Sequence, residues 1–336
     1  MSIEFFWRLP TGGDGRYGNG TQSRRGERVS SQPYFTEGVS DPRGTKFNYF
    51  DYLDQVARAA ELAGFDGLQI RNDPEGDEPW IVAGYVARST RRLRLLTEFD
   101  ASRGSAVYAA KNAVSYQRYS GGRFAWQIGT GGTDAERRRQ GDFAADAAVG
   151  PRIEEFVTVA RGVIQSPSFT FKGPYFEVLN GGFKGPLGGI PAPRVHLSGS
   201  GAESYERSAR IADVHIFESL PLGELEAEIG KLRAINRERP NALELGLRID
   251  VLARETQEEA EFDARREREQ SRDAGLNGAL VGSHEQVAGW LADYARAGVS
   301  HFVLGAVPHL EEAYRVGEHI LPAVRGTLAS SSRNAA

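Results

Sequence analysis

The sequence predicts an α/β protein, a single (β/α)8 TIM barrel with insertion loops. Short apolar runs alternate with helical patterns over nearly the whole chain, and eight such runs are present. Strands that alternate with helices are typical of a parallel sheet, and eight of them can close a barrel. An open doubly wound sheet is the rival, but it needs a G-x-G-x-x-G turn after its first strand. Here the first strand runs into LPTGGDG, with no such spacing and no helix directly after it.

The candidate strands share short runs of apolar residues bounded by polar or glycine-rich turns. In chain order they are Ile3–Leu9, Gly67–Ile70, Leu93–Glu98, Phe124–Gly129, Val195–Leu197, Val214–Phe217, Leu245–Leu252 and His301–Leu304. The candidate helices repeat apolar residues near helical spacing. They are Phe50–Leu62, Pro151–Ile164, Ala202–Ala212, Gly223–Ile235, Thr256–Arg268, Glu285–Ala297 and Leu310–Val324.

Three insertions interrupt this alternation. The polar stretch Pro10–Lys46 follows the first strand, Ser166–Gly188 is predicted to be a small hairpin with a Gly/Pro loop, and Glu269–Gly278 joins two late helices. Loops after strands lie on the active-site face of a barrel, so loop 10–46 is either a lid or partner contact or a mobile ornament. The expected domain therefore spans residues 1–326, with insertion 166–190, and residues 327–336 form a disordered tail.

Composition excludes several classes of function. The formal net charge of −4 and the lack of a basic patch interleaved with aromatic residues argue against nucleic acid and anionic membranes as partners. Cysteine is absent, and no histidine pair has zinc-ligand spacing, so we expect no metal site. The N-terminus lacks the basic region of a signal peptide and no apolar run could cross a membrane, so the predicted location is cytoplasmic.

Two terminal segments resemble one family. FFWRLPTGGDGRYG at the start resembles the opening of the alkanesulfonate monooxygenases, and FVLGAVPHLEEAYRVGEHILP (Phe302–Pro322) resembles their last strand and helix. AAELAGFDGLQI, YSGGRFAWQIGTGG, LGLRIDVLARET and GALVGSHEQVAGWLADYARAGVSHFVL follow in the family's order, so the resemblance covers roughly Ile3–Pro322. It implies a bacterial-luciferase-like barrel that uses oxygen and reduced FMN supplied by a separate NAD(P)H-dependent flavin reductase. It also implies a small-molecule substrate and a homodimer or homotetramer.

The clearest candidate cofactor site is a turn between a strand and a helix. The strand that ends at Leu197 enters a helix through Ser198, Gly199, Ser200, Gly201 and Ala202. Small residues let the backbone approach a phosphate, and the free N–H groups at a helix start favour an anion. The resemblance implies that this turn binds the flavin phosphate, although Ser-Gly turns also serve as ordinary helix caps.

Three further residues are cofactor candidates by resemblance. Thr130 follows the fourth strand and should lie beside the flavin, and Gln127 stands where the family often has Asn. Asp100 ends the third strand, where it would either contact the isoalloxazine edge or be an exposed loop carboxylate.

The candidate catalytic residues cluster late in the chain. Arg248 and Asp250 are two apart on one strand, so both point to the same face, into the barrel mouth. They are either functional or a structural salt bridge. The resemblance matches Arg248 to the family's R-x-H arginine and His309 to an active-site histidine, although His309 could instead be a helix-capping or surface histidine. It also places a mobile-loop arginine at Arg272, with the neighbouring Asp273 as the alternative alignment.

The pocket departs from the family at several positions. Gly12, Gly76, Glu218, Asp250 and Val307 stand where alkanesulfonate enzymes have His, Cys, Trp, His and Tyr. Most of these positions line the substrate side.

Arginines near the strand ends suggest a different anion site. Arg8, Arg71 and Arg103 lie near the ends of the first three strands and could bind an anion together with Arg248, with Glu218 on the same substrate side.

The leading hypothesis is a reduced-FMN monooxygenase acting on a small organosulfur compound of the sulfonate type, with C–S cleavage as one outcome. The alternatives are a flavin or deazaflavin oxidoreductase with a non-sulfur substrate and a non-catalytic flavin-binding protein.

Overall fold

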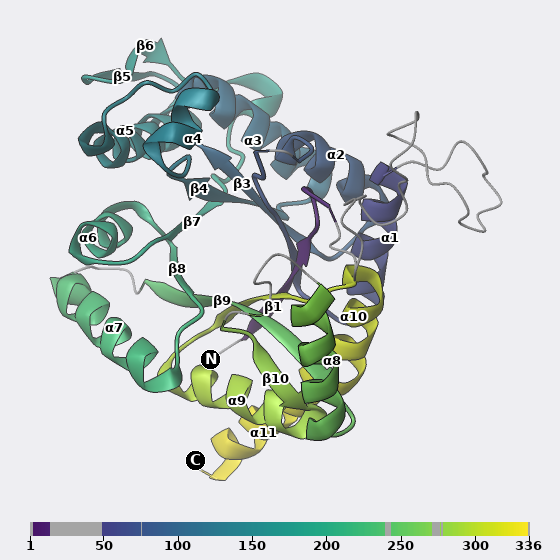
Figure 1. Ribbon diagram of the computed structural model, residues 1–336. Coiled ribbons are helices and arrows are strands. Elements are labelled where there is room, and N and C mark those ends of the chain that lie inside the picture. Colours follow the sequence, from purple (N-terminus) through teal and green to yellow (C-terminus); the bar gives the residue numbers. More distant parts are fainter. Residues whose placement is uncertain are drawn as a thin grey trace. The chain divides into compact units, whose positions relative to one another are not determined.

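The computed structural model describes residues 3–13, 49–74, 76–238, 243–270, 276 and 278–334. Parallel strands separated by helices give the chain the (β/α)8 TIM-barrel fold that the sequence predicts (Figure 1). The chain divides into two compact units. The first comprises Met1–Leu93, Phe217–Glu226 and Leu245–Ala336, and the second comprises Arg94–Ile216 and Ala227–Glu244.

The first unit contains a parallel sheet in the order β10-β9-β11-β1-β2. Its elements are β1 (Glu4–Leu9), α1 (Tyr49–Leu62), β2 (Gly67–Ile70), α2 (Pro79–Ser89), β9 (Glu244–Arg254), α8 (Gln257–Gln270), β10 (Leu280–Ser283), α9 (His284–Ala297), β11 (His301–Gly305), α10 (His309–Arg315), a π-helical segment η4 (Val316–Ile320) and α11 (Leu321–Asn334). Aromatic residues fill its core. The rings of Phe5 and Phe302 stack at 5.4 Å, and the fully buried Trp7 packs 5.1 Å from Phe65.

The second unit contains the parallel order β3-β4-β7-β8. Its elements are β3 (Arg94–Asp100), α3 (Ala106–Ser120), β4 (Phe124–Gly129), α4 (Asp134–Arg139), α5 (Asp146–Gln165), β5 (Phe169–Lys172), β6 (Glu177–Gly181), the 3-10 turn η2 (Gly185–Leu187), β7 (Arg194–Ser198), α6 (Ala202–Ile211) and the 3-10 turn η3 (Asn236–Glu238). Two further elements, β8 (Val214–Glu218) and α7 (Leu222–Ile235), have residues in both units. Trp126 and Phe99 meet edge to face at 5.5 Å in its core.

The structure confirms the eight predicted strands and the hairpin of the second insertion, since β5 and β6 pair antiparallel. It adds a short parallel strand, β10, beside the end of β9. The sequence pattern also missed the helices α2, α3 and α4.

The C-terminal tail differs from the expected disorder, because α11 continues to Asn334. Its hydroxyl groups bond within the helix: Thr327 Oγ1 donates to the Ala323 carbonyl at 2.9 Å and Ser330 Oγ to the Gly326 carbonyl at 2.9 Å. The serine-rich composition of this segment therefore did not prevent it from forming a helix. Most of loop 10–46 lies outside the described residues. No helix in the described ranges combines the length and the apolar character that crossing a bilayer requires.

Candidate active site

In the first unit, the predicted charges of β9 lie on one face of the strand but take different partners. Arg248 and Asp250 are both half-buried, whereas Leu247, Ile249 and Val251 between and beside them are buried. Asp250 forms an ion pair with Arg8 of β1. Arg248 binds Glu218 at the end of β8 through two nitrogens, with Nε 2.9 Å from Oε2. The recorded ion pairs therefore link β9 to other strands.

A glycine makes the Arg8–Asp250 pair possible. Strand β11 lies between β1 and β9, with Gly305 in register with Asp250 and Leu304 in register with Trp7. A Cβ built on Gly305 would collide with the Arg8 guanidinium. The arginine therefore crosses the end of β11 over a residue without a side chain. Burial lowers the pKa of Arg8, the charges of Arg71 and Arg248 lower it further, and Asp250 opposes them.

Arg71 follows β2 and is exposed. Its backbone carbonyl accepts a hydrogen bond from Thr11 Oγ1 at 3.0 Å, which joins the ends of β1 and β2. Arg8 and Arg248 each have a carboxylate partner, whereas no ion pair of the Arg71 side chain is recorded within the described part of the chain. Arg71 thus differs from Arg8 and Arg248 in having no recorded carboxylate partner among the described residues.

The two glycines at predicted pocket positions make room for an aspartate. A Cβ on Gly12 would overlap the carboxylate of Asp73, and a Cβ on Gly76 would lie 2.9 Å from the Asp73 Cβ and 2.8 Å from the Thr11 carbonyl oxygen. Asp73, which the sequence pattern did not single out, therefore fills the space beside both glycines.

His309 is the first residue of α10 and is buried. Its carbonyl accepts a hydrogen bond from Trp7 Nε1 at 3.1 Å, and the two rings meet edge to face at 6.3 Å. Burial rules out the surface role that the sequence left open. Arg272, and Asp273 beside it, lie outside the described residues.

In the second unit, Asp100 is buried at the end of β3, so the alternative of an exposed carboxylate is wrong. A Cβ on Gly129 would lie 2.6 Å from Asp100 Oδ1, so glycine makes space for this side chain. Arg103, at 3.8 Å from Asp100 Oδ2, is about half-exposed and also donates a hydrogen bond to Gln140. Its recorded partners therefore lie in its own unit.

A row of three polar residues, of which two are buried, crosses strands β3, β4 and β7. Gln127 is fully buried and its Nε2 donates to Glu98 Oε1 at 3.3 Å. Glu98, Gln127 and the buried His196 are register partners on β3, β4 and β7. Neither Glu98 nor His196 was predicted as a site residue, although each polar position alternates with apolar ones in its strand. Thr130 follows β4 and is exposed.

The strand-to-helix turn has the predicted form. Ser198 ends β7, Gly199 and Gly201 have φ of 134° and 85°, and Ala202 begins α6. No side chain caps the helix start, and Ser200 is exposed. A Cβ on Gly199 would lie 2.6 Å from Ser204 Oγ. The first-turn N–H groups of α6 therefore have no recorded side-chain acceptor.

A histidine that was not predicted as a site residue contacts helix α6. His215 of β8 is fully buried and its Nδ1 lies 2.7 Å from Ser208 Oγ. Burial lowers the pKa of His215 to about 4, so the ring is neutral at neutral pH. Its ring also meets Tyr205 edge to face at 5.2 Å.

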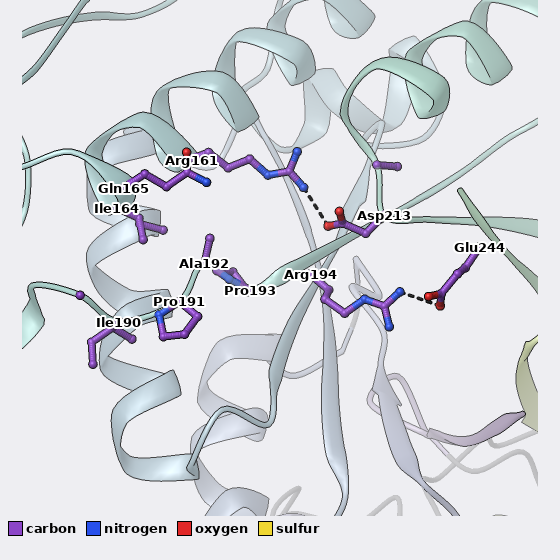
Figure 2. Close-up of a pocket in the computed structure, with 12 residues that line it drawn as sticks. Arg161, Ile164, Gln165, Ile190, Pro191, Ala192, Pro193, Arg194, Asp213 and Glu244 are labelled. Atoms are coloured by element: carbon purple, nitrogen blue, oxygen red, sulfur yellow. Dashed lines mark hydrogen bonds and ion pairs between the residues drawn. The ribbon is translucent and has the colours of Figure 1, made fainter. Parts of the chain in front are cut away.

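A separate cavity of about 870 Å³ lies at the opposite ends of the strands in this unit (Figure 2). Arg194 begins β7, and Glu244, its partner at 2.7 Å, begins β9. Arg161 bonds Asp213, which directly precedes β8, at 2.8 Å. None of the predicted site residues lines this cavity. Among the described residues there is also no group of three or more His, Asp or Glu placed to hold a metal.

The comparisons with known proteins agree with this fold. A solved riboflavin lyase with modified FMN and riboflavin has a TM-score of 0.77 at 16% identity over 97% of this chain and 92% of that one. The EDTA monooxygenase from Chelativorans sp. BNC1 has a TM-score of 0.73 at 15% identity, with coverages of 97% and 94%. An F420-dependent secondary alcohol dehydrogenase has a TM-score of 0.72 at 16% identity, over 96% of this chain and 99% of that one. These likenesses concern the fold alone.

The family itself follows from the sequence. The model of the family described as luciferase-like monooxygenase matches residues 21–301, which is most of the chain. This protein is therefore an enzyme, an oxidoreductase, and belongs to the luciferase-like monooxygenase family of flavin-dependent enzymes.

Proposed function

We propose that this enzyme is a reduced-FMN-dependent monooxygenase that uses oxygen on a small anionic organosulfur compound of the sulfonate type. A separate NAD(P)H-dependent reductase supplies the flavin, and the enzyme works as a homodimer or homotetramer. The observation that carries the cofactor part is the uncapped helix start behind the Ser198–Ala202 turn.

The turn fits a phosphate. Two glycines with positive φ shape it, and the position of Gly199 has no room for a Cβ beside Ser204. The exposed Ser200 hydroxyl and the N–H groups that begin α6 are hydrogen-bond donors that suit a dianion, and the helix dipole has the right sign.

The ends of β3 and β4 suit a flat ring. Gly129, Gly131 and Gly132 carry no side chains, so a ring could approach the backbone beside Thr130. Gln127 and Asp100 are buried polar groups of the same strand ends, and their amide and carboxylate suit the polar edge of an isoalloxazine. When bound, the flavin supplies electrons to activate oxygen.

The substrate part of the proposal comes from the arginines of the first unit. Arg71 would bind the anionic group directly, while Arg8 and Arg248 are held in place by Asp250 and Glu218. His309 would donate a hydrogen bond to the substrate from the end of β11. Arg103 would also contact the substrate. Arg272, which lies outside the described residues, would have the role of closing over the substrate that the resemblance implies.

The test is titration of the protein with reduced FMN under nitrogen, for the native chain, Ser200→Asp and the matched Ser200→Asn. A carboxylate at this exposed position should repel the phosphate and weaken binding roughly tenfold or more, whereas the amide should change it little. Riboflavin, which lacks the phosphate, should bind weakly to all three. Equal FMN binding by the three proteins would place the phosphate elsewhere.

Turnover then tests the substrate class. Native enzyme with reduced FMN and oxygen should oxidise members of a sulfonate panel, and Arg71→Gln should raise KM more than it lowers kcat. A preference for a reduced deazaflavin, with hydride transfer and no oxygen consumption, would favour the dehydrogenase alternative. Tight FMN binding with no turnover of any substrate would favour a flavin-binding protein that is not catalytic.

A further inference from the structure

A buried carboxyl group lies in a charged cluster beside the end of β9. Glu267 is in the last turns of α8 and is only 9% exposed. Its Oε2 is buried and has no hydrogen-bond partner among the residues that the structure describes. An ionised carboxylate in such a place would lack the hydrogen bonds that normally offset its burial.

The neighbouring charges already balance without Glu267. Arg254, the last residue of β9, lies 2.5 Å from Asp263 of α8 and 3.3 Å from Glu312 of α10. Glu312 is almost fully buried and also pairs with Arg315. Two arginines therefore face two carboxylates, and an ionised Glu267 would be an unbalanced fifth charge.

The charges that act most strongly on Glu267 lie on α8 itself, on α10 and on β9. They are Asp263 on its own helix, Glu312 on α10, and Arg254 and Asp250 on β9. Burial raises the pKa of Glu267 most, Glu312 raises it further, and Arg254 opposes them, with the result at about 7 against an ordinary 4.5.

Asp250 connects this cluster to the candidate active site. It is four residues before Arg254 on β9, it forms the ion pair with Arg8, and its field reaches Glu267. We propose that Glu267 is a positioning residue that works in its neutral form, and that its ionisation adds a negative charge at the end of the strand that carries Asp250, the partner of Arg8, and weakens the binding of an anionic substrate. This inference rests on the proposed anion-binding role of the first unit's arginines.

The first measurement is thermal unfolding between about pH 5 and about pH 8.5 for the native protein, Glu267→Gln and the control Glu258→Gln. Because the folded pKa of Glu267 lies above the unfolded value, its stabilising contribution is complete below 4.5 and is lost as the pH rises through about 7. Glu267→Gln should therefore match the native Tm at the acid end and exceed it by a few degrees at the alkaline end. The exposed Glu258 on the same helix should give curves parallel to the native one.

The second measurement is calorimetric titration with octanesulfonate at the two ends of that range. Native protein and Glu258→Gln should lose affinity several-fold from the acid to the alkaline end, while Glu267→Gln should retain it. In steady-state assays the difference should fall on KM and leave kcat nearly unchanged. Glu267→Asp, which keeps the acid, should restore the pH dependence.

The outcomes separate two failures. If octanesulfonate binds with the same pH dependence in the native protein and Glu267→Gln, or if their Tm curves run parallel, the role of Glu267 is overturned while the proposed function stands. If octanesulfonate binds to none of the proteins at either pH, the proposed substrate class fails, and the role of Glu267 fails with it.

Discussion

The Arg8–Asp250 pair shows what a pattern of residues can and cannot predict. Strand periodicity correctly predicts that Arg248 and Asp250 share a face, because alternate residues of a strand point the same way. It cannot predict their partners, because Arg8 is 242 positions away from Asp250 in the chain. The room at Gly305 that lets Arg8 cross β11 is likewise visible only in the folded chain.

Removing the charge of Asp250 should cost more stability than removing that of Glu218. Asp250→Asn leaves the Arg8 guanidinium, only 16% exposed, without its counter-charge, so we expect a loss of about 2–3 kcal/mol in the free energy of unfolding. Arg248 is likewise 16% exposed, but its partner Glu218 is 55% exposed against 29% for Asp250, so water screens the Arg248–Glu218 pair more and Glu218→Gln should cost less, about 1 kcal/mol.

Urea unfolding of the two variants beside the native protein measures this difference. Each substitution replaces a carboxylate by an amide of the same shape, so packing is kept constant in both. Equal losses in the two variants would mean that the Arg8–Asp250 pair is as well solvated as the Arg248–Glu218 pair.

At the scale of elements, segments with a strong apolar pattern were predicted correctly from the sequence, whereas segments with a weak pattern were missed. The eight strands were recognised because each is a compact apolar run, and β4 has the same bounds in prediction and structure, Phe124–Gly129. Strand β10, LVGS, is too short and mixed to stand out, and it exists because its backbone pairs with the extended end of β9. Helix α3 buries mainly alanine along one side, which gives little apolar contrast.

The candidate site was predictable to a similar degree. The Ser198–Ala202 turn could be read from local sequence, since glycines at a strand end carry their own conformational signal. Asp73, Glu98 and His215 were missed because single polar residues acquire meaning only from what they contact across strands and loops. The arginines could be picked out by their places near strand ends, but which of them have carboxylate partners was not predictable.

The cap at the start of α9 can be tested by substitution. Strand β10 ends at Ser283 and α9 begins at His284, with no loop between them. Ser283 and Gln286 form a capping box: Ser283 Oγ accepts from the Gln286 N–H at 3.2 Å, and the Gln286 side chain accepts from the Ser283 N–H at 2.8 Å. Ser283→Ala should lower the free energy of unfolding by about 1 kcal/mol, and Ser283→Asp, which can still cap, should lower it less. Unfolding in urea measures both, and equal losses would show that the hydroxyl does not act as a cap.

At the scale of the whole molecule, two buried titratable groups set opposite limits on stability. Glu267 favours its neutral form and opposes stability as the pH rises, whereas His215 favours its neutral form and opposes stability as the pH falls. One lies in each unit, so the pH range of greatest stability depends on both units rather than on the modest net charge of −4.

The loss of folding stability at acid pH is attributed to His215. Its folded pKa of about 4 lies below the ordinary 6.5, so the unfolded chain binds a proton that the folded chain does not over that interval. Stability from this group is therefore present above 6.5 and is lost as the pH falls through about 4, by up to about 3 kcal/mol. His215→Gln can still bond Ser208 but cannot titrate. It should flatten the acid limb of a plot of unfolding free energy against pH, whatever its constant cost from altered packing. The control is Ser208→Ala, which removes the hydrogen-bond partner of His215 but keeps the titratable ring, and so should keep the acid limb. If His215→Gln keeps the native slope between about pH 6.5 and about pH 4, the acid limb arises from other groups, and His215 does not resist protonation in the folded protein.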